Sequence, residues 1–332
     1  MTQAAMIPTM LKPESPTNLT MLESDRLRKI DLINHLLGGR VRSALNDPDV
    51  TEVYCNHDGY LRTNGTGGRK RLDCRMPLDT TNSILSTLAD FVGRRLGGAV
   101  TSIAASLPTG ERIHGMIPPS VPGPSFSIRV PPKRIYSLDE YVLKGIMTEG
   151  QLAAIRQAIA DKMTIATVGG TSSGKTTLLN AILNEAGYKN RRQIIVQNVP
   201  ELKTSAEDAE FFFTDPKTIM ELLEDAMRMN PDQIIVGEVR GPEAWDMLQA
   251  WNTGHEGSAT TFHANNPEAA LLRLRGLCIA GGKQVLPGEL ISALHVIVWI
   301  SHDPERGRVV KQVARPKSYN AETGLFQCEV IA

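Results

Sequence analysis

A run of small residues that ends in Lys-Thr stands at positions 169–176 and has the composition of a phosphate-binding loop. It reads Gly-Gly-Thr-Ser-Ser-Gly-Lys-Thr and fits the pattern G-x-x-x-x-G-K-[ST] at every position. The apolar stretch 165–168 precedes it and a helical pattern follows, which is the context that this motif requires. Glycines let backbone amides curl around phosphate oxygens, and the start of the following helix adds its positive end. The sequence therefore predicts a nucleoside-triphosphate site.

The residue types within this loop indicate how a triphosphate would be held. Lys175 is expected to neutralise the β and γ phosphates, and Thr176 to offer its hydroxyl to Mg²⁺. We expect ATP and Mg²⁺ as cofactors. The sequence has no N-K-x-D segment of the kind that recognises guanine, which counts against GTP but does not by itself indicate adenine. The residues expected to bind the nucleotide are Gly169, Gly170, Thr171, Ser172, Ser173, Gly174, Lys175, Thr176 and Thr177.

An acid at the end of a second apolar stretch is the candidate catalytic carboxylate. Residues 233–236 read Gln-Ile-Ile-Val and are followed by Gly237 and Glu238. Many phosphate-loop enzymes have a magnesium-binding aspartate where this chain has Gly237, so the first acid here is Glu238. A glutamate at that point can orient or deprotonate the attacking water, and it can contact Mg²⁺ through a water.

The sequence around Glu238 resembles a family signature. Residues 228–241, which read Arg-Met-Asn-Pro-Asp-Gln-Ile-Ile-Val-Gly-Glu-Val-Arg-Gly, resemble the signature of the type II/type IV secretion traffic ATPases. Residues 251–257 and 261–265 are similar to the histidine box of that family, and residues 267–274 continue it. Together with the phosphate loop, the resemblance covers about residues 45–300.

Within that family the chain resembles the conjugative-transfer ATPases most, through residues 44–48 and the prolines that precede residues 126–129. The resemblance implies a ring of six copies, each with an N-terminal PAS-like α+β domain and a C-terminal RecA-like domain that hold ATP between them. It also implies contacts with inner-membrane components and other ATPases of a secretion or conjugation apparatus. The expected function is an ATP-hydrolysing motor for assembly or substrate transfer, located at the cytoplasmic face of the inner membrane.

Charged residues outside the loop match catalytic positions of the family. His263 would sense the γ-phosphate, although a histidine at a strand end is by itself more often structural. Arg112 and Arg129 match arginines of the N-terminal domain, while Arg240 would act across a subunit boundary or form a surface ion pair. A planar guanidinium suits the charge that develops during phosphoryl transfer. The expected catalytic residues are Glu238, Lys175, His263, Glu201, Arg112, Arg129 and Arg240.

One box of the chain departs from the family pattern. The family carries Ile-Glu-Asp-x-x-Glu-Leu after the strand beyond the phosphate loop, whereas residues 196–202 read Val-Gln-Asn-Val-Pro-Glu-Leu. Gln197 and Asn198 can hold a water, but they cannot supply charge to Mg²⁺ or accept a proton at neutral pH. We therefore expect slow hydrolysis or a stronger dependence on the acids that are present, Glu201 and Glu238.

A parallel sheet would position these residues. From residue 147 onward, apolar strand patterns alternate with helical ones, which predicts a mostly parallel sheet with helices on both faces. The expected strands are 165–168, 193–199, 233–236, 259–262 and 294–300, and the expected helices are 176–186, 218–229, 243–251 and 267–279. Residues 308–313 and 325–331 are expected to form a terminal hairpin, to which no function is assigned.

The expected α/β organisation has two domains. Residues 23–130 form the PAS-like α+β domain and residues 147–332 the RecA-like ATPase domain. The segment 131–146, which begins with two prolines, is the expected linker and hinge, and the proline-containing residues 1–22 are the expected flexible tail. The smaller domain is expected to contain helices at 24–37 and 80–96 and strands at 50–56, 102–107, 112–117 and 125–130.

Charge and cysteine content argue against other classes of protein. The chain has 36 basic and 36 acidic residues, so bulk charge does not hold it to nucleic acid or to anionic lipid. Its four cysteines form no C-x-x-C pair, which argues against a zinc module and a disulfide framework. No apolar run approaches the ~20 residues of a membrane span, and no signal peptide is evident. A cytoplasmic protein with a peripheral membrane link at most is expected.

Three alternative functions stay open at the level of the sequence. A pilus-assembly or retraction motor of the same superfamily would share these motifs, although many of the assembly enzymes carry a four-cysteine zinc insertion. A RecA-like nucleic-acid motor would be stimulated by single-stranded DNA in a salt-dependent way, and direct nucleic-acid binding is left undecided. A non-catalytic nucleotide-binding scaffold is the third alternative, suggested by Gln197 and Asn198.

We expect Asn198→Asp to raise the rate of ATP turnover several-fold, because it returns a negative charge to the predicted metal site. A phosphate-release assay on the wild type and the variant measures this. Asn190→Asp adds the same charge outside the motif and serves as the control. An unchanged rate in Asn198→Asp would show that the missing acid does not limit catalysis.

Overall fold

The computed structural model describes residues 21–332, with gaps at 66, 108, 132–133 and 215–216. The chain divides into two compact units, residues 1–131 and 132–332. The expected tail over residues 1–22 lies outside the described residues except for its last two positions, where helix α1 begins.

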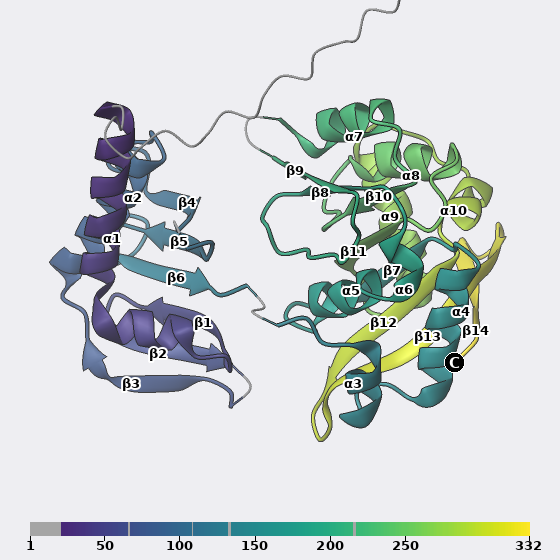
Figure 1. The fold of residues 1–332 in the computed structure, drawn as a ribbon, viewed down its shortest axis with the longest axis horizontal. Helices are drawn as coiled ribbons and strands as arrows, with labels where there is room; N and C mark the ends of the chain where they lie inside the picture. The colour runs from purple at the N-terminus through teal and green to yellow at the C-terminus, as the bar shows by residue number, and fades with distance from the viewer. Residues whose placement is uncertain (1–20, 66, 108, 132–133, 215–216) are drawn as a thin grey trace, which may run out of the picture. The chain divides into compact units, whose positions relative to one another are not determined.

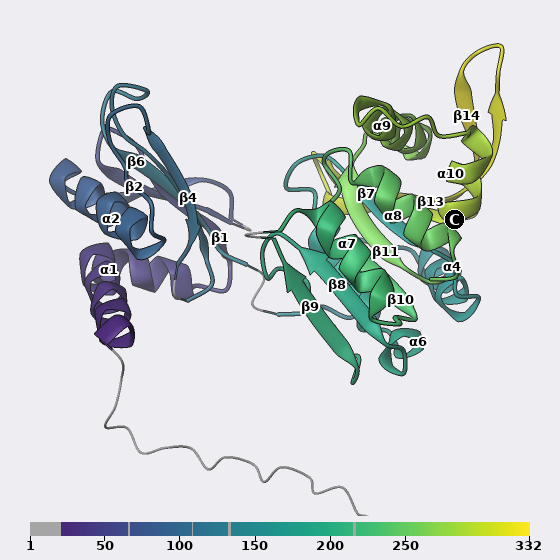
Figure 2. The same cartoon turned by 90° about the horizontal axis from the view of Figure 1, so that it is seen from above.

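The described residues of the first unit form a six-stranded antiparallel sheet in the order β3-β2-β1-β6-β5-β4. Helices α1 (Met21–Asn46) and α2 (Leu78–Phe91) pack against one face of this sheet (Figures 1 and 2). The strands are β1 (Val50–Cys55), β2 (Tyr60–Gly65), β3 (Lys70–Arg75), β4 (Ser102–Ser106), β5 (Arg112–Met116) and β6 (Ser125–Arg129). Alternate strand residues point toward the helices and are buried, among them Val53, Ile113 and Ile128.

The part of the second unit that the structure describes contains an eight-stranded sheet in the order β14-β13-β12-β7-β11-β10-β8-β9. Neighbouring strands from β12 to β9 run parallel, and β13 and β14 continue the sheet antiparallel. Its strands are β7 (Ile165–Gly169), β8 (Gln193–Gln197), β9 (Ala209–Phe213), β10 (Gln233–Val236), β11 (Ala259–His263), β12 (Val296–Asp303), β13 (Gly307–Asn320) and β14 (Leu325–Val330). The alternation of elements from residue 147 onward therefore predicted the sheet type correctly.

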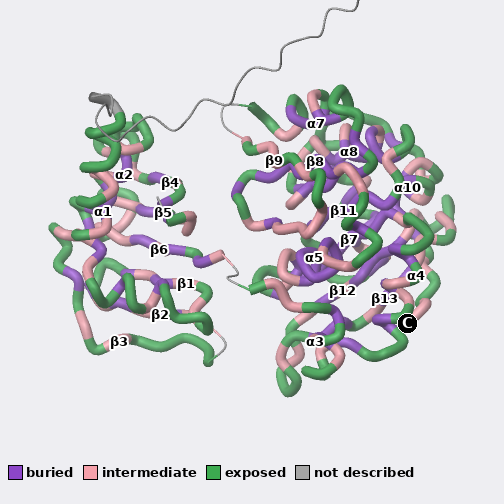
Figure 3. The backbone as a smooth tube through the Cα atoms, viewed as in Figure 1, coloured by how far each residue is buried: buried purple, intermediate pink, exposed green. Residues whose placement is uncertain are grey.

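Helices cover both faces of this second sheet. One face packs against α3 (Leu138–Leu143), α4 (Glu149–Ala160), α5 (Lys175–Leu183) and α6 (Ala186–Lys189). The other face packs against α7 (Ile219–Arg228), α8 (Ala244–Asn252), α9 (Pro267–Ala280) and α10 (Pro287–Ala293). Strands β7, β8 and β10 are buried at every residue, as expected for parallel strands covered on both sides (Figure 3).

The segment 131–146, expected from the sequence to be a linker, contains a helix. Helix α3 lies within it and buries Leu138 and Tyr141 in the core of the second unit. A capping box between Ser137 and Glu140 starts this helix, so a signal for it is present in the sequence. The unit boundary at residues 131 and 132 thus precedes an element that belongs to the second unit.

The terminal hairpin is confirmed, and its first strand is longer than expected. The predicted strand at 308–313 is the first part of β13, which extends to Asn320 and pairs with β14. Helices α4, α6 and α10 and strand β9 of the second unit, and strand β3 of the first, were also not predicted from the sequence.

Candidate functional site

The loop at residues 170–174 connects β7 to α5 at the carboxyl end of the sheet (Figure 1). Gly169 precedes it, and a Cβ at that position would lie 2.1 Å from the carbonyl oxygen of Ile300. Gly174 has a φ of +99° and caps the start of α5 in the left-handed conformation. Both glycines of the motif therefore have a physical reason, since a residue with a Cβ would clash at Gly169 and be strained at Gly174.

The loop fits a phosphate chain. A Cβ built at Gly170 would meet no atom within 4 Å, so the backbone is open to an approaching group there. The Ser173 hydroxyl is buried and has no hydrogen-bond partner among the described residues. An open backbone and a buried hydroxyl suit the oxygen atoms of a nucleotide, which accept several hydrogen bonds at once.

A chain of polar contacts extends from this loop across the sheet edge. The Lys175 ammonium donates a hydrogen bond to the Gly170 carbonyl at 2.8 Å and lies 3.3 Å from Nδ1 of His263. Nε2 of His263 lies 3.2 Å from a carboxylate oxygen of Glu238, whose other oxygen accepts a bond from Arg240. The structure thus brings together four of the predicted catalytic residues.

Parallel pairing explains why these distant residues meet. His263 is paired in register with Gly169 across β11 and β7, and Glu238 follows the end of β10, the next strand. The carboxyl ends of parallel strands share one edge of a sheet, where ligands of α/β proteins bind. The backbone beyond β10 is held by Thr261, whose hydroxyl donates to the Gly237 carbonyl at 2.8 Å.

Neighbouring positive charges keep the Glu238 carboxylate ionised. Burial raises the pKa of Glu238, but the hydrogen bond and charge of Arg240, with smaller effects of His263 and Lys175, outweigh burial and hold that pKa below its usual range. Burial, and next the charge of Lys175, lower the pKa of His263 below 6.5. A neutral imidazole that accepts at Nδ1 from Lys175 carries its proton on Nε2 and can donate it toward Glu238.

Glu201 is held by neutral amides. The Gln197 side-chain oxygen accepts from the backbone amides of Glu201 and Leu202 at 3.1 and 2.9 Å. Asn180 donates to the Glu201 carbonyl at 2.9 Å and accepts from the Lys203 amide at 2.8 Å. The negative charge of Glu201 also acts on the pKa of Arg240, so the acid lies near the chain of contacts. Gln197 therefore positions the Glu201 loop through a side-chain oxygen that accepts hydrogen bonds as a carboxylate oxygen would, but Gln197 carries no negative charge.

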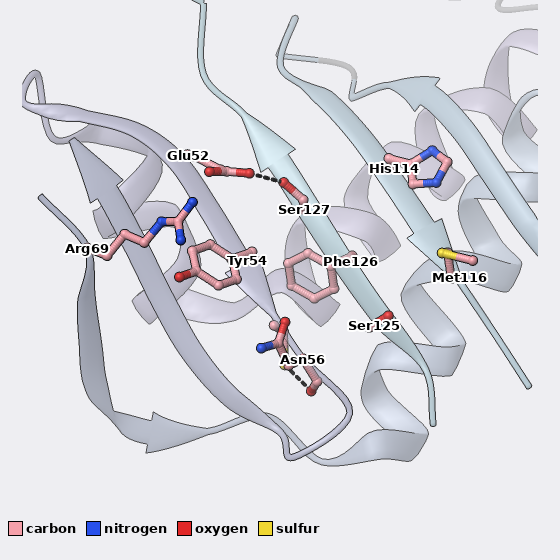
Figure 4. A pocket seen from close by; sticks show the side chains of 10 residues that line it. Glu52, Tyr54, Asn56, Arg69, His114, Met116, Ser125, Phe126 and Ser127 are labelled. Atoms are coloured by element: carbon pink, nitrogen blue, oxygen red, sulfur yellow. Dashed lines mark hydrogen bonds between the residues drawn. The ribbon is translucent and has the colours of Figure 1, made fainter. Parts of the chain in front are cut away.

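Arg112 and Arg129 lie in the first unit, on the sheet face opposite to its helices. They are cross-strand neighbours in β5 and β6, and Glu52 of β1 pairs with Arg129 on its other side. A hollow of about 330 Å³ opens on this face, where Ser127 donates a hydrogen bond to Glu52 at 2.6 Å (Figure 4). The structure brings the two arginines together, and their action on the phosphate loop stays a prediction.

The magnesium assignment to Thr176 and Glu238 also stays a prediction. Thr176 follows Lys175 in the first turn of α5 and is half-buried. Among the described residues, no three or more His, Cys, Asp or Glu side chains cluster closely enough to hold a metal by themselves. A cation here would need oxygens of the nucleotide and of water as further ligands, which is the usual arrangement for Mg²⁺.

Within the described part of the chain, no helix has the length and apolar character of a membrane span.

Sequence reasoning did not identify several residues that support the site. Glu243 accepts hydrogen bonds from the backbone amides of Arg240 and Gly241 at 2.8 and 2.9 Å. The Gly241-Pro242 pair that precedes it is a turn signal that the sequence does contain. Asn180 and Thr261 carry no local signal, because their roles depend on neighbours far away in the chain. Nδ1 of His255, in the histidine box, lies 2.6 Å from the carbonyl oxygen of Ala250 near the end of α8.

We expect the pKa of His263 to rise in Lys175→Ala, because removing the cation lowers the cost of protonating the ring. In Glu238→Gln the pKa should fall, because the carboxylate favours the imidazolium. A pH titration of the histidine ring carbons by NMR measures both shifts, with His263→Gln used to assign the signal. Lys189→Ala, which removes an exposed charge on α6, is the control. Shifts of the same sign in both variants would contradict the contact chain.

Comparisons with known proteins agree with this geometry. The family model described as "Type II/IV secretion system protein" matches residues 78–329. The probable conjugal transfer protein TrbB of Sinorhizobium fredii is 35% identical over 296 residues, which cover 88% of this chain and 91% of that protein. The conjugal transfer protein TrbB of Rhizobium radiobacter is 36% identical over 296 residues, with the same coverage of 88% and 91%.

A solved structure shows the same fold. The pilus retraction motor PilT, determined with bound ADP, is 17% identical to this chain with a TM-score of 0.59, and the match covers 89% of this chain and 82% of that one. The α/β fold, with an N-terminal PAS-like and a C-terminal RecA-like domain, is therefore confirmed. Matched by the family model over most of its length and by relatives above 30% identity, the chain belongs to the type II/IV secretion system protein family.

Proposed function

We propose that this chain is an ATP-hydrolysing motor that powers assembly or substrate transfer in a type IV secretion or conjugation apparatus. Family membership and the TrbB relatives, which align over nine-tenths of their length, support the biological setting. The observation that carries the chemistry is the contact chain from Lys175 through His263 to Glu238 at the mouth of the phosphate loop.

The residues of this series of contacts have complementary roles. Lys175 and the loop amides hold phosphate oxygens, and the Thr176 hydroxyl holds the magnesium ion. Glu238, ionised and bonded to Arg240, orients a water and accepts its proton. Mg-ATP, when bound, supplies the phosphoryl group and the negative charge that these cations neutralise. His263 contacts both Lys175 and Glu238, so it can report to the carboxylate whether the ammonium is engaged with phosphate.

The motor works as a ring of six copies in this proposal. Arg112 and Arg129 of the first unit complete the phosphate site, and Arg240 acts there within or between copies. Differential binding of ATP and ADP to closed and open arrangements of the two units provides the bias for movement. Inner-membrane components and other ATPases of the apparatus are the partners, and the chain lies on the cytoplasmic side of the inner membrane.

We expect wild-type protein to release phosphate from Mg-ATP, and Glu238→Gln to lower this rate by about 10²–10⁴-fold while nucleotide binding persists, because the variant loses the general base. Lys175→Ala should lose both binding and turnover. Glu224→Gln, which changes an exposed acid on α7, is the matched control. Equal phosphate release by the wild type and Lys175→Ala would favour a scaffold and contradict the motor.

Single-stranded DNA tests the nucleic-acid alternative in the same assay. We expect no stimulation of phosphate release at low or high salt, because the chain carries no net charge to attract a polyanion. Stimulation that declines with rising salt would instead favour a RecA-like nucleic-acid motor.

A further inference from the structure

The hairpin of β12 and β13 lies along the phosphate loop. Strand β12 pairs in parallel with β7, the strand that leads into the loop (Figure 1). The pairing of β12 with β13 shifts register between Trp299 and Ile300. The Ile300 carbonyl lies against Gly169, and its side chain would be 3.6 Å from a Cβ at Gly174. The hairpin therefore contacts the loop at both ends of the glycine motif.

Arg308 extends this contact along the middle of the loop. It stands at the start of β13, opposite His302 of β12. Its Nε donates a hydrogen bond to the Ser172 carbonyl at 3.3 Å. Its Cδ would lie 3.2 Å from a Cβ at Gly174. The side chain thus follows the loop backbone from Ser172 to Gly174.

The loop residue that Arg308 binds is conformationally strained. Ser172 has a φ of +58°, in the left-handed region that residues with a Cβ avoid. Such a conformation persists when surrounding contacts stabilise it, and it is often found where a backbone must present its amides to a ligand. The hydrogen bond from Arg308 is such a stabilising contact. The Ser172 carbonyl can point at the guanidinium only when the backbone angles of Ser172 lie in a limited range.

The contact with the loop backbone supports a positioning role for this arginine. An arginine that binds phosphate directly would use its guanidinium donors for the ligand. Here Nε, the donor nearest the backbone of Arg308, is used by the loop itself. The neighbouring Arg306 of the same hairpin binds elsewhere and donates to the Gly145 carbonyl at 3.1 Å.

We propose that Arg308 is a positioning residue of the nucleotide site, which holds Ser172 in its left-handed conformation and so keeps the loop amides ready for phosphate. This inference rests on the proposed function, since it concerns nucleotide binding by the same loop. It assigns a role to the start of β13, the first strand of the terminal hairpin to which the sequence assigned no function.

Three variants of the full-length chain test the proposal. Arg308→Ala removes the hydrogen bond to the Ser172 carbonyl, and Arg308→Lys retains the charge without the planar Nε donor. Ser172→Gly combined with Arg308→Ala supplies a residue that adopts positive φ without strain. Arg306→Ala, which removes a neighbouring cation that does not contact the loop, is the matched control. Equilibrium binding of mant-ATP and steady-state ATP turnover are measured for each variant, and thermal unfolding checks that each is folded.

We expect Arg308→Ala and Arg308→Lys to weaken mant-ATP binding and raise KM about tenfold, with kcat within about twofold of wild type, because loop preorganisation contributes equally to ground and transition states. In the Arg308→Ala background, Ser172→Gly should recover most of the lost affinity. Arg306→Ala should bind as the wild type does.

If wild type binds mant-ATP and Lys175→Ala does not, three results would overturn the assignment of Arg308 alone. The first is wild-type affinity for mant-ATP in Arg308→Ala. The second is wild-type affinity in Arg308→Lys, which would show that charge suffices, and the third is no recovery of affinity in the double variant. A wild-type protein that binds mant-ATP no better than Lys175→Ala would overturn the proposed function together with this inference.

Discussion

The parallel pairing of β7, β11 and β10 is the constraint on which the candidate site depends. It brings Lys175, His263 and Glu238 to one edge of the sheet, with contacts of 3.3 and 3.2 Å between successive side chains. Side chains alternate along a strand, so a slip of β11 by one residue would turn His263 to the other face of the sheet and break both contacts. The two cores on opposite faces of these strands oppose such a slip, because it would turn each buried side chain into the core of the other face, which is packed around different residues.

The charge balance of the site follows from this arrangement. Burial alone would favour a protonated Glu238, but the cations around it keep its carboxylate ionised. Gln197 adds no negative charge and uses its oxygen to hold the backbone of Glu201 and Leu202. The departure from the acidic box of the family thus separates two tasks, since a neutral amide positions the loop while the charge comes from Glu201 and Glu238. This arrangement leaves fewer acids for the proposed magnesium ion.

The hairpin of β12 and β13 connects the loop to the segment that follows the unit boundary. Arg308 contacts the loop, while the Val310 amide donates to the Ile146 carbonyl at 2.7 Å and Arg306 to the Gly145 carbonyl. Gln151 of α4 donates to the Val310 carbonyl at 3.2 Å. One strand therefore contacts both the phosphate loop and the first elements of the second unit. A movement of the loop would reach these elements through the Arg308 side chain and then through the backbone hydrogen bond of Val310.

The sequence by itself determined the phosphate loop, the parallel sheet and the candidate acid, because glycine spacing, apolar strands and a strand-end glutamate are local patterns. It missed α3, although the Ser137–Glu140 capping box is a local signal, because the prolines before it indicated a linker. Only the tertiary structure decided that Asn180 holds the Glu201 loop and that Arg308 lies on Ser172. Those contacts join residues that are 21 and 136 positions apart. They exist only once strand order and register have placed the partners within hydrogen-bond distance, and no local pattern encodes that order.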